Sequence, residues 1–183
     1  MRNSKACKGR RGFVIVYTGD GKGKTTAALG LALRAIGHDL KVLMIQFIKG
    51  RWNYGELKSA KRLSPNFEIV TMGRGYVRKD DKVEFEKHKV AAKEALEFSK
   101  EKLISGKYDV VILDEINYAQ NLQLISVEDI LDLIRSKPPS ITLVLTGNYA
   151  HPSILEVADL VTEMRMIKHP YQRGIKGEKG IDY

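Results

Sequence analysis

A glycine-rich loop, residues 17–26 with the sequence YTGDGKGKTT, carries the residue types that bind the phosphates of a nucleotide. Its backbone N–H groups would form a concave anion site at the start of a helix, and its glycines would let phosphates approach closely. Lys24 would neutralise phosphate charge, and the Thr25 hydroxyl would coordinate Mg²⁺. The first glycine comes one residue later than the usual pattern requires, and an additional lysine, Lys22, lies inside the loop. The loop predicts a triphosphate–magnesium site but does not name its reaction.

A pair of carboxylates, Asp114 and Glu115, follows the apolar run YDVVIL. Acidic residues placed directly after a buried strand commonly hold the Mg²⁺ of a bound nucleotide, either directly or through water. Two other interpretations stay open. The carboxylates could cap a helix or form salt bridges, and one of them could activate water for hydrolysis.

Two further segments carry side chains that could contact a ligand. In the stretch QFIKGRWNYGE, which begins at Gln46, Lys49 and Arg51 could contact phosphates and Trp52 could stack on a base. A strand end followed by a surface loop explains this stretch equally well. Residues 72–78, MGRGYVR, place a glycine-flanked aromatic in a predicted loop, which alone is a weak indication of function.

The elements that must position these residues alternate between strands and helices. Short apolar runs rich in β-branched residues predict buried parallel strands. We expect them at residues 12–17, 41–47, 67–72, 108–113 and 141–146, with a last one at 158–164. Helical spacing predicts helices at residues 25–36, 80–104 and 126–135, the last with Ser126 as N-cap and Asp129 three residues later. One face of the long helix carries Phe85, Ala92, Leu96, Ser99 and Leu103.

This alternation predicts an α/β fold, a single domain built on an open, mostly parallel sheet with helices on both faces. Ligands of such sheets lie at the carboxyl ends of the strands. The loops at these ends are therefore expected to build one site: residues 19–25, 46–54, 114–118 and 146–149. Residues 1–11 are expected to be a short basic segment, residues 12–183 the domain, and residues 165–183 an irregular tail that needs a partner surface.

Composition limits the class of protein. The chain has 183 residues, a net charge of +9, and no apolar run near the roughly 20 residues that span a bilayer. Its N-terminus lacks the apolar stretch of a secretory signal, so we expect a cytoplasmic protein without membrane contact. Cys7 is the single cysteine, His88 and His151 are expected at the surface, and no protein-held zinc or iron site is expected. The positive charge would attract nucleic acid, nucleotides or other anions, and a solvated surface with a site for an anionic ligand is favoured over nucleic acid as a partner.

Taken together, the motifs resemble the P-loop type of ATP:corrinoid adenosyltransferase, which acts in cobalamin synthesis and salvage. The resemblance runs from about Arg11 to the last residue, through TGDGKGKTTAA, AIGH, VLMIQFIKG, VVILDEINYA, VLTGN, ADLVTEM, KHP and GIDY. It implies a P-loop NTPase fold of the RecA-like type and a homodimer. It also implies transfer of the 5′-deoxyadenosyl group of ATP to the cobalt(I) of a reduced corrinoid, with triphosphate as the leaving group. An electron-donating flavoprotein reductase would supply the reduced corrinoid.

Residue roles follow from the resemblance by motif position. It implies that Lys24, Thr25 and Glu115 are catalytic, that Thr25 and Glu115 bind Mg²⁺, and that Tyr76 and Arg78 contact the corrinoid. The residues implied to bind ATP are Thr18, Gly19, Asp20, Gly21, Lys22, Gly23, Lys24, Thr25, Thr26, Gln46, Lys49 and Arg51.

The chain departs from the family pattern at three places. Arg78 stands where the family's corrinoid loop has its second aromatic, Asn148 stands where arginine is common, and the N-terminal segment is short. An arginine cannot supply the same apolar wedge beside a corrin, which affects corrinoid preference and reduction. Two alternative functions stay open: a RecA-like ATPase stimulated by nucleic acid, which a pI near 9.5 would suit, and a regulatory or corrinoid-carrying module without turnover.

Overall fold

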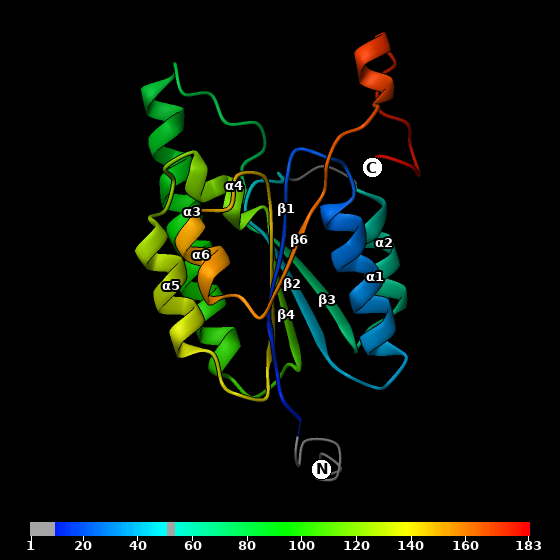
Figure 1. Cartoon of the computed structure of the whole chain (residues 1–183), viewed down its shortest axis with the longest axis vertical. Helices are drawn as coiled ribbons and strands as arrows, with labels where there is room; N and C mark the ends of the chain where they lie inside the picture. The colour runs from blue at the N-terminus through cyan, green and yellow to red at the C-terminus, as the bar shows by residue number, and fades with distance from the viewer. Residues whose placement is uncertain (1–9, 51–53) are drawn as a thin grey trace.

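The computed structural model describes residues 10–50 and 54–183, which fold around one six-stranded sheet (Figure 1). Every pair of neighbouring strands is parallel, in the order β3-β2-β4-β5-β1-β6. The predicted parallel α/β sheet is confirmed, and each predicted strand is present. The strands are β1 (Val14–Thr18), β2 (Val42–Gln46), β3 (Phe67–Thr71), β4 (Val110–Asp114), β5 (Thr142–Thr146) and β6 (Leu160–Glu163).

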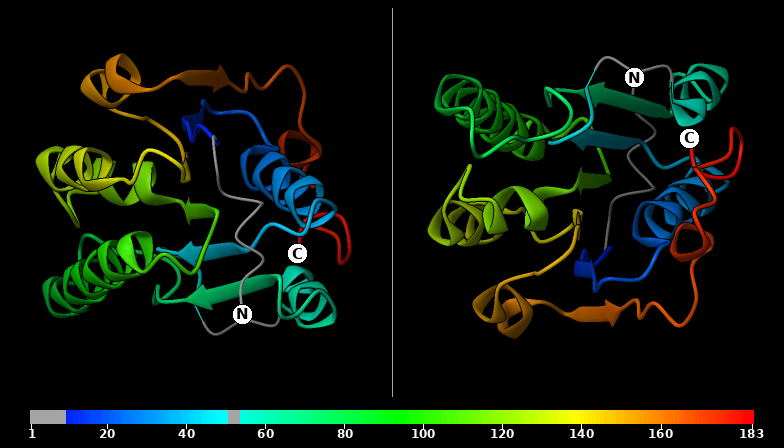
Figure 2. Two further views of the ribbon diagram at one scale, coloured as in Figure 1. Left: turned by 90° about the horizontal axis from the view of Figure 1, so that it is seen from below. Right: turned by 90° about the horizontal axis from the view of Figure 1, so that it is seen from above.

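Helices cover both faces of the sheet (Figures 1 and 2). One layer contains α1 (Lys24–Ile36) and α2 (Gly55–Arg62). The other contains α3 (Lys82–Ile104), α4 (Ile116–Asn121), α5 (Val127–Ser136) and α6 (Pro152–Val157). The sequence predicted α1, α3 and α5 but missed α2, α4 and α6, which have six to eight residues and too few turns for a helical period to show.

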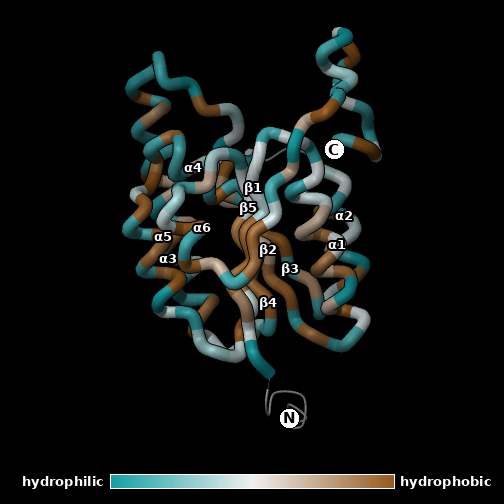
Figure 3. Tube along the Cα trace, in the orientation of Figure 1, coloured by the Kyte–Doolittle hydropathy of each residue, from teal (hydrophilic) through white to brown (hydrophobic). Residues whose placement is uncertain are grey.

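The central strands form the core because both of their faces are buried. Every residue of β2, β4 and β5 is buried, as expected for parallel strands covered by helices on both sides. Figure 3 shows this as an apolar band between the two helical layers. By contrast, all four residues of the edge strand β6 are exposed. Within the described ranges, no helix is long and apolar enough to span a membrane.

Two predictions concern single helix residues, Ser126 at the start of α5 and His88 on α3. Ser126 caps α5 as expected: its hydroxyl accepts a hydrogen bond from the Asp129 N–H at 3.1 Å, and the Asp129 carboxylate accepts one from the Ser126 N–H at 2.9 Å. The expected surface position of His88 is wrong, because only 6% of this residue is exposed. His88 lies four residues before Ala92, on the buried face of α3.

Candidate active site

The strand order brings the four predicted loops to one edge of the sheet. β1 lies between β5 and β6, β4 lies between β2 and β5, and all strands point the same way, so their carboxyl ends are adjacent. The loop after β1, residues 18–26, is called the phosphate loop below. The tail, residues 165–183, leaves β6 at this same edge and includes a short 3-10 helix, Pro170–Arg173 (Figure 2).

The phosphate loop is held in shape by its own lysine and by the end of β6. The Lys24 ammonium donates to the carbonyl oxygens of Gly19 at 2.8 Å and Gly21 at 2.7 Å. Gly21 N–H donates to Met164 O at 2.6 Å, and a Cβ on Gly21 would lie 2.6 Å from that oxygen. Gly23, the N-cap of α1, has a φ of +117°, a conformation that favours glycine. The loop therefore needs glycine both for close packing and for its backbone angles.

The side chains of the phosphate loop interact with groups outside it as well as with the loop itself. Burial lowers the pKa of Lys24, while the carboxylates of Glu115 and Asp20 oppose this effect. Lys22, the additional lysine, forms an ion pair with Asp182 of the tail. The Thr18 hydroxyl accepts a hydrogen bond from the Ala150 N–H at 3.1 Å, so it supports the adjoining loop.

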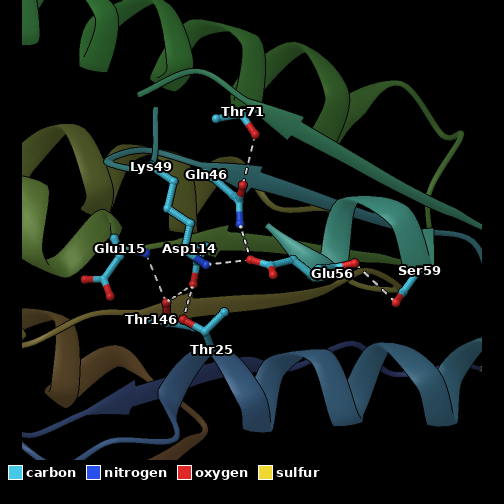
Figure 4. Close-up of polar contacts among 10 residues, drawn as sticks. Thr25, Gln46, Lys49, Glu56, Ser59, Thr71, Asp114, Glu115 and Thr146 are labelled. Carbon is cyan, nitrogen blue, oxygen red and sulfur yellow. Dashed lines mark hydrogen bonds and ion pairs between the residues drawn. The ribbon is translucent and has the colours of Figure 1, made fainter. Parts of the chain in front are cut away.

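The first carboxylate of the acidic pair connects the segments at the ends of three strands, β1, β4 and β5 (Figure 4). Asp114 is fully buried, and its Oδ1 accepts hydrogen bonds from the hydroxyls of Thr25 at 2.8 Å and Thr146 at 2.9 Å. Its Oδ2 makes no hydrogen bond and lies 3.4 Å from the Lys49 ammonium. The Thr25 hydroxyl, which is expected to coordinate Mg²⁺, thus contacts Asp114. The family resemblance did not imply Asp114 as a metal ligand.

The second carboxylate, Glu115, lies at the start of α4 and lines a pocket of about 650 Å³. Its backbone has a φ of +64°, and its N–H donates to the Thr146 hydroxyl at 3.0 Å. Burial, and then the charge of Asp114, raise the pKa of Glu115 to about 7, although Lys24 and Lys49 oppose the shift. Glu115 is therefore placed where a nearby cation would strongly favour its ionised form.

Glu115 should make stability depend on pH. Its ordinary pKa of 4.5 rises to about 7 on folding, so the folded protein binds more protons between these values. The free energy of unfolding should therefore fall as pH rises from 4.5 to about 7, by on the order of 2 kcal/mol. Urea denaturation in metal-free buffer checks this, and Glu115→Gln should flatten that part of the profile. Parallel profiles for the two proteins would contradict the assignment.

A third charged group comes from α2, which the sequence did not predict. Glu56 Oε1 accepts hydrogen bonds from the Lys49 ammonium at 2.8 Å and from Gln46 Nε2 at 3.3 Å (Figure 4). Gln46 Oε1 in turn accepts from the Thr71 hydroxyl at 2.9 Å. Although burial opposes both charges, Asp114 and Glu56 raise the pKa of Lys49, and Lys49 lowers the pKa of Glu56. Lys49 is therefore a fixed cation between two carboxylates.

One pocket of about 650 Å³ joins these groups. Its polar lining includes Lys22, Lys24, Thr25, Thr26, Lys49, Glu56, Glu115 and Asn148, and four tail residues, Gly180–Tyr183, complete it. A smaller pocket of about 330 Å³ also borders the phosphate loop and is lined by Asp20, Gly21, Lys22, Lys24, Met166, His169, Tyr171 and Gln172. Arg51, the remaining predicted ATP contact, and Trp52 lie outside the described residues.

The predicted corrinoid segment lies beside the Gln46–Lys49 segment. Gly75 N–H donates to Ile48 O at 2.8 Å, and a Cβ on Gly73 would lie 2.3 Å from the Ile48 carbonyl carbon. Tyr76 is 86% exposed and Arg78 is also exposed, and neither lines the 650 Å³ pocket. The structure therefore places an exposed aromatic and an arginine next to the segment that carries Lys49.

Relatives of this chain are found among known protein families and proteins. The family model described as ATP:corrinoid adenosyltransferase BtuR/CobO/CobP matches residues 10–183. The chain is 38% identical to a corrinoid adenosyltransferase of Escherichia coli (strain K12) over 173 residues, which cover 94% of this chain and 86% of the relative. It is 35% identical to the corrinoid adenosyltransferase CobA of Salmonella typhimurium (strain LT2), with the same coverage.

A solved structure shares the fold alone. The flagellar accessory protein FlaH from Methanocaldococcus jannaschii aligns with a TM-score of 0.55 at 15% identity, over 84% of this chain and 71% of FlaH. At that identity the likeness concerns the α/β fold and not the activity. By the family match and the identities to its relatives, the chain belongs to the ATP:corrinoid adenosyltransferase family.

Proposed function

We propose that this chain transfers the 5′-deoxyadenosyl group of ATP to the cobalt(I) of a reduced corrinoid, in cobalamin synthesis or salvage. The observation that carries the proposal is the convergence of three lysines, Lys22, Lys24 and Lys49, on one pocket with Thr25 and Glu115. A triphosphate gains charge as its bond to carbon breaks, and preorganised cations stabilise that charge. Membership of the family favours this reaction over hydrolysis stimulated by nucleic acid.

The proposed reaction forms one bond and breaks one. The cobalt(I) electron pair attacks C5′ of ATP, the C5′–O bond breaks, and its electron pair leaves with the triphosphate. The cobalt becomes formally cobalt(III), so no protein nucleophile is needed. The chain's own residues bind and orient: the phosphate loop holds the triphosphate, and Lys24 and Lys49 balance its charge.

The residues present fit a bound Mg²⁺. Thr25, Asp114 and Glu115 offer hydroxyl and carboxylate oxygens, and the buried Asp114 Oδ2 lacks a hydrogen bond. Among the described residues, no group of three or more His, Cys, Asp or Glu side chains could hold a metal alone. We infer that phosphate oxygens and water supply the remaining ligands, as is usual for Mg²⁺ on nucleotides, with Thr25 and Glu115 as the protein ligands. The ion would neutralise charge on the leaving triphosphate.

Tyr76 and Arg78 are the proposed corrinoid contacts. Their loop lies beside the segment that carries Lys49, so a corrin over this loop would face the same edge of the sheet as the nucleotide. An exposed aromatic offers an apolar surface to a corrin, and an arginine can meet its amide or phosphate groups.

The remaining proposals concern the setting of the reaction. We propose a homodimer because the family resemblance implies one. A flavoprotein reductase as electron donor and a cytoplasmic location suit an enzyme whose second substrate must be kept as cobalt(I). An anaerobic assay with ATP, Mg²⁺ and chemically reduced cobalamin tests the function, with a parallel arm that adds DNA or RNA but no corrinoid. Adenosylated cobalamin in the first arm is expected. Hydrolysis of ATP in the second arm, with no adenosylated product in the first, would support the ATPase instead.

Glu56 is expected to act by positioning Lys49. Glu56→Gln keeps the shape but removes the charge that holds the ammonium, so the KM for ATP should rise about fivefold with little change in kcat. Steady-state kinetics with varied ATP measures this. Glu97→Gln, which loses an exposed ion pair with Lys100, is the matched control and should leave both constants unchanged. A fall in kcat at constant KM would contradict the positioning role.

A further inference from the structure

The end of the tail crosses the 650 Å³ pocket from one wall to the other. On one side, the Asp182 carboxylate pairs with Lys22 of the phosphate loop. On the other side, a Cβ added to Gly55 of α2 would lie 3.8 Å from the carbonyl carbon of Tyr183. The segment thus bridges the phosphate loop and the start of α2, where Figure 1 shows the end of the chain beside the upper parts of α1 and α2.

Hydrogen bonds within the segment give it a defined shape between these two contacts. Gly180 N–H donates to Tyr183 O at 2.8 Å, and Ile181 N–H donates to Glu178 O at 3.2 Å. The Asp182 carboxylate, besides pairing with Lys22, accepts the Glu178 N–H at 2.6 Å. Asp182 therefore fixes the turn and its place on the phosphate loop together.

The pocket also has an apolar part, beyond the phosphate loop. Leu29 and Leu33 of α1, Leu63 beyond α2, and Ile181 of the tail all line it. Two of these side chains are largely exposed, Leu33 at 62% and Ile181 at 72%. Exposed aliphatic side chains that line one pocket favour a ligand with an apolar surface. A nucleotide supplies such a surface in its base.

We propose that residues 180–183 form the third wall of the nucleoside part of the site, with Ile181 packing on the base. This rests on the proposed function, in which the phosphate loop holds the triphosphate. The polar lining at Lys49, Glu115 and Asn148 suits the phosphates and the metal, whereas the apolar lining, from α1, Leu63 and this segment, suits the base. The Asp182–Lys22 pair holds the wall in place, so one tail residue ties the nucleoside end of the site to its phosphate end.

Binding of two ligands separates this role from any effect on the phosphates. Calorimetric titration with ATP and with inorganic triphosphate, each with Mg²⁺, is carried out on the full chain and on Ile181→Ala. ATP should bind about fivefold more weakly to the variant, because aliphatic area over the base is lost, whereas triphosphate affinity should not change. Ile175→Ala is the matched control: Ile175 is a half-exposed isoleucine of the same tail that does not line the pocket, and its loss should affect neither ligand.

The other outcomes would overturn the proposal. Equal weakening of both ligands would mean that Ile181 only supports the phosphate loop, and unchanged affinity for both would mean that the tail does not touch the nucleoside. Both of these outcomes are judged against the unsubstituted chain, which must itself bind ATP. If it binds ATP with the expected difference between variants but forms no adenosylated corrinoid, the nucleoside wall stands and the proposed function fails.

Discussion

Lys24→Ala is expected to reduce adenosylation by about 10³-fold, the largest effect of any single substitution in this site. The Lys24 ammonium both holds the phosphate loop, through the carbonyls of Gly19 and Gly21, and faces the pocket that would receive the triphosphate. Its loss removes a cation from the leaving group and two hydrogen bonds from the loop. Initial rates under anaerobic conditions with saturating ATP and Mg²⁺ measure the effect.

The same substitution must leave the fold intact for that result to count. Circular dichroism and the thermal midpoint should show a folded domain, because the core lies between the sheet and the helical layers and not in the loop. Lys87→Ala, on the exposed face of α3, is the control for loss of a lysine and should keep full activity. A folded Lys24→Ala protein with normal rates would remove Lys24 from the mechanism.

Glu115→Gln is expected to lower kcat/KM for ATP by about 10²-fold. The substitution keeps the size of the side chain but removes the charge that would balance Mg²⁺ beside Thr25. Raising the Mg²⁺ concentration should restore part of the activity, since the remaining oxygen ligands still bind the ion. Rates measured over a series of Mg²⁺ concentrations test both statements.

Glu128→Gln is the control for loss of a glutamate charge, because Glu128 is exposed on α5, away from the pocket. It should leave the dependence on Mg²⁺ unchanged. Unaltered Mg²⁺ dependence in Glu115→Gln would transfer the role of metal ligand to Asp114, which already contacts the Thr25 hydroxyl.

The sequence predicted those parts of the fold that have a strong local pattern. Each buried strand is a run of apolar, often β-branched residues, and the central three are buried throughout. The phosphate loop was evident because glycine, lysine and threonine are all required within a few residues. The acidic pair stood directly after such a strand, so its place at the carboxyl edge followed from the alternation of strands and helices.

Other parts of the site depend on contacts between distant segments. Glu56 lies on an eight-residue helix with one buried side chain, Ala60, so the sequence has no apolar periodicity that predicts this helix. The available sequence signal for the helix was a glutamate directly after Gly55, because acidic residues are favoured in the first turn of a helix. The ion pair between Asp182 and Lys22 joins two residues that are 160 positions apart in the sequence. The tail that carries Asp182 has no periodicity from which this contact could be predicted. His88 was misplaced because a polar residue type outweighed its position on the buried face of α3.

The fate of the phosphates tests the central claim most directly. ATP is incubated with the protein, Mg²⁺ and chemically reduced cobalamin without oxygen, and the phosphorus-containing products are identified by ³¹P NMR. Intact inorganic triphosphate, formed in a one-to-one ratio with adenosylated cobalamin, is the predicted result. ADP and phosphate as the only products, with the corrinoid unmodified, would contradict the account.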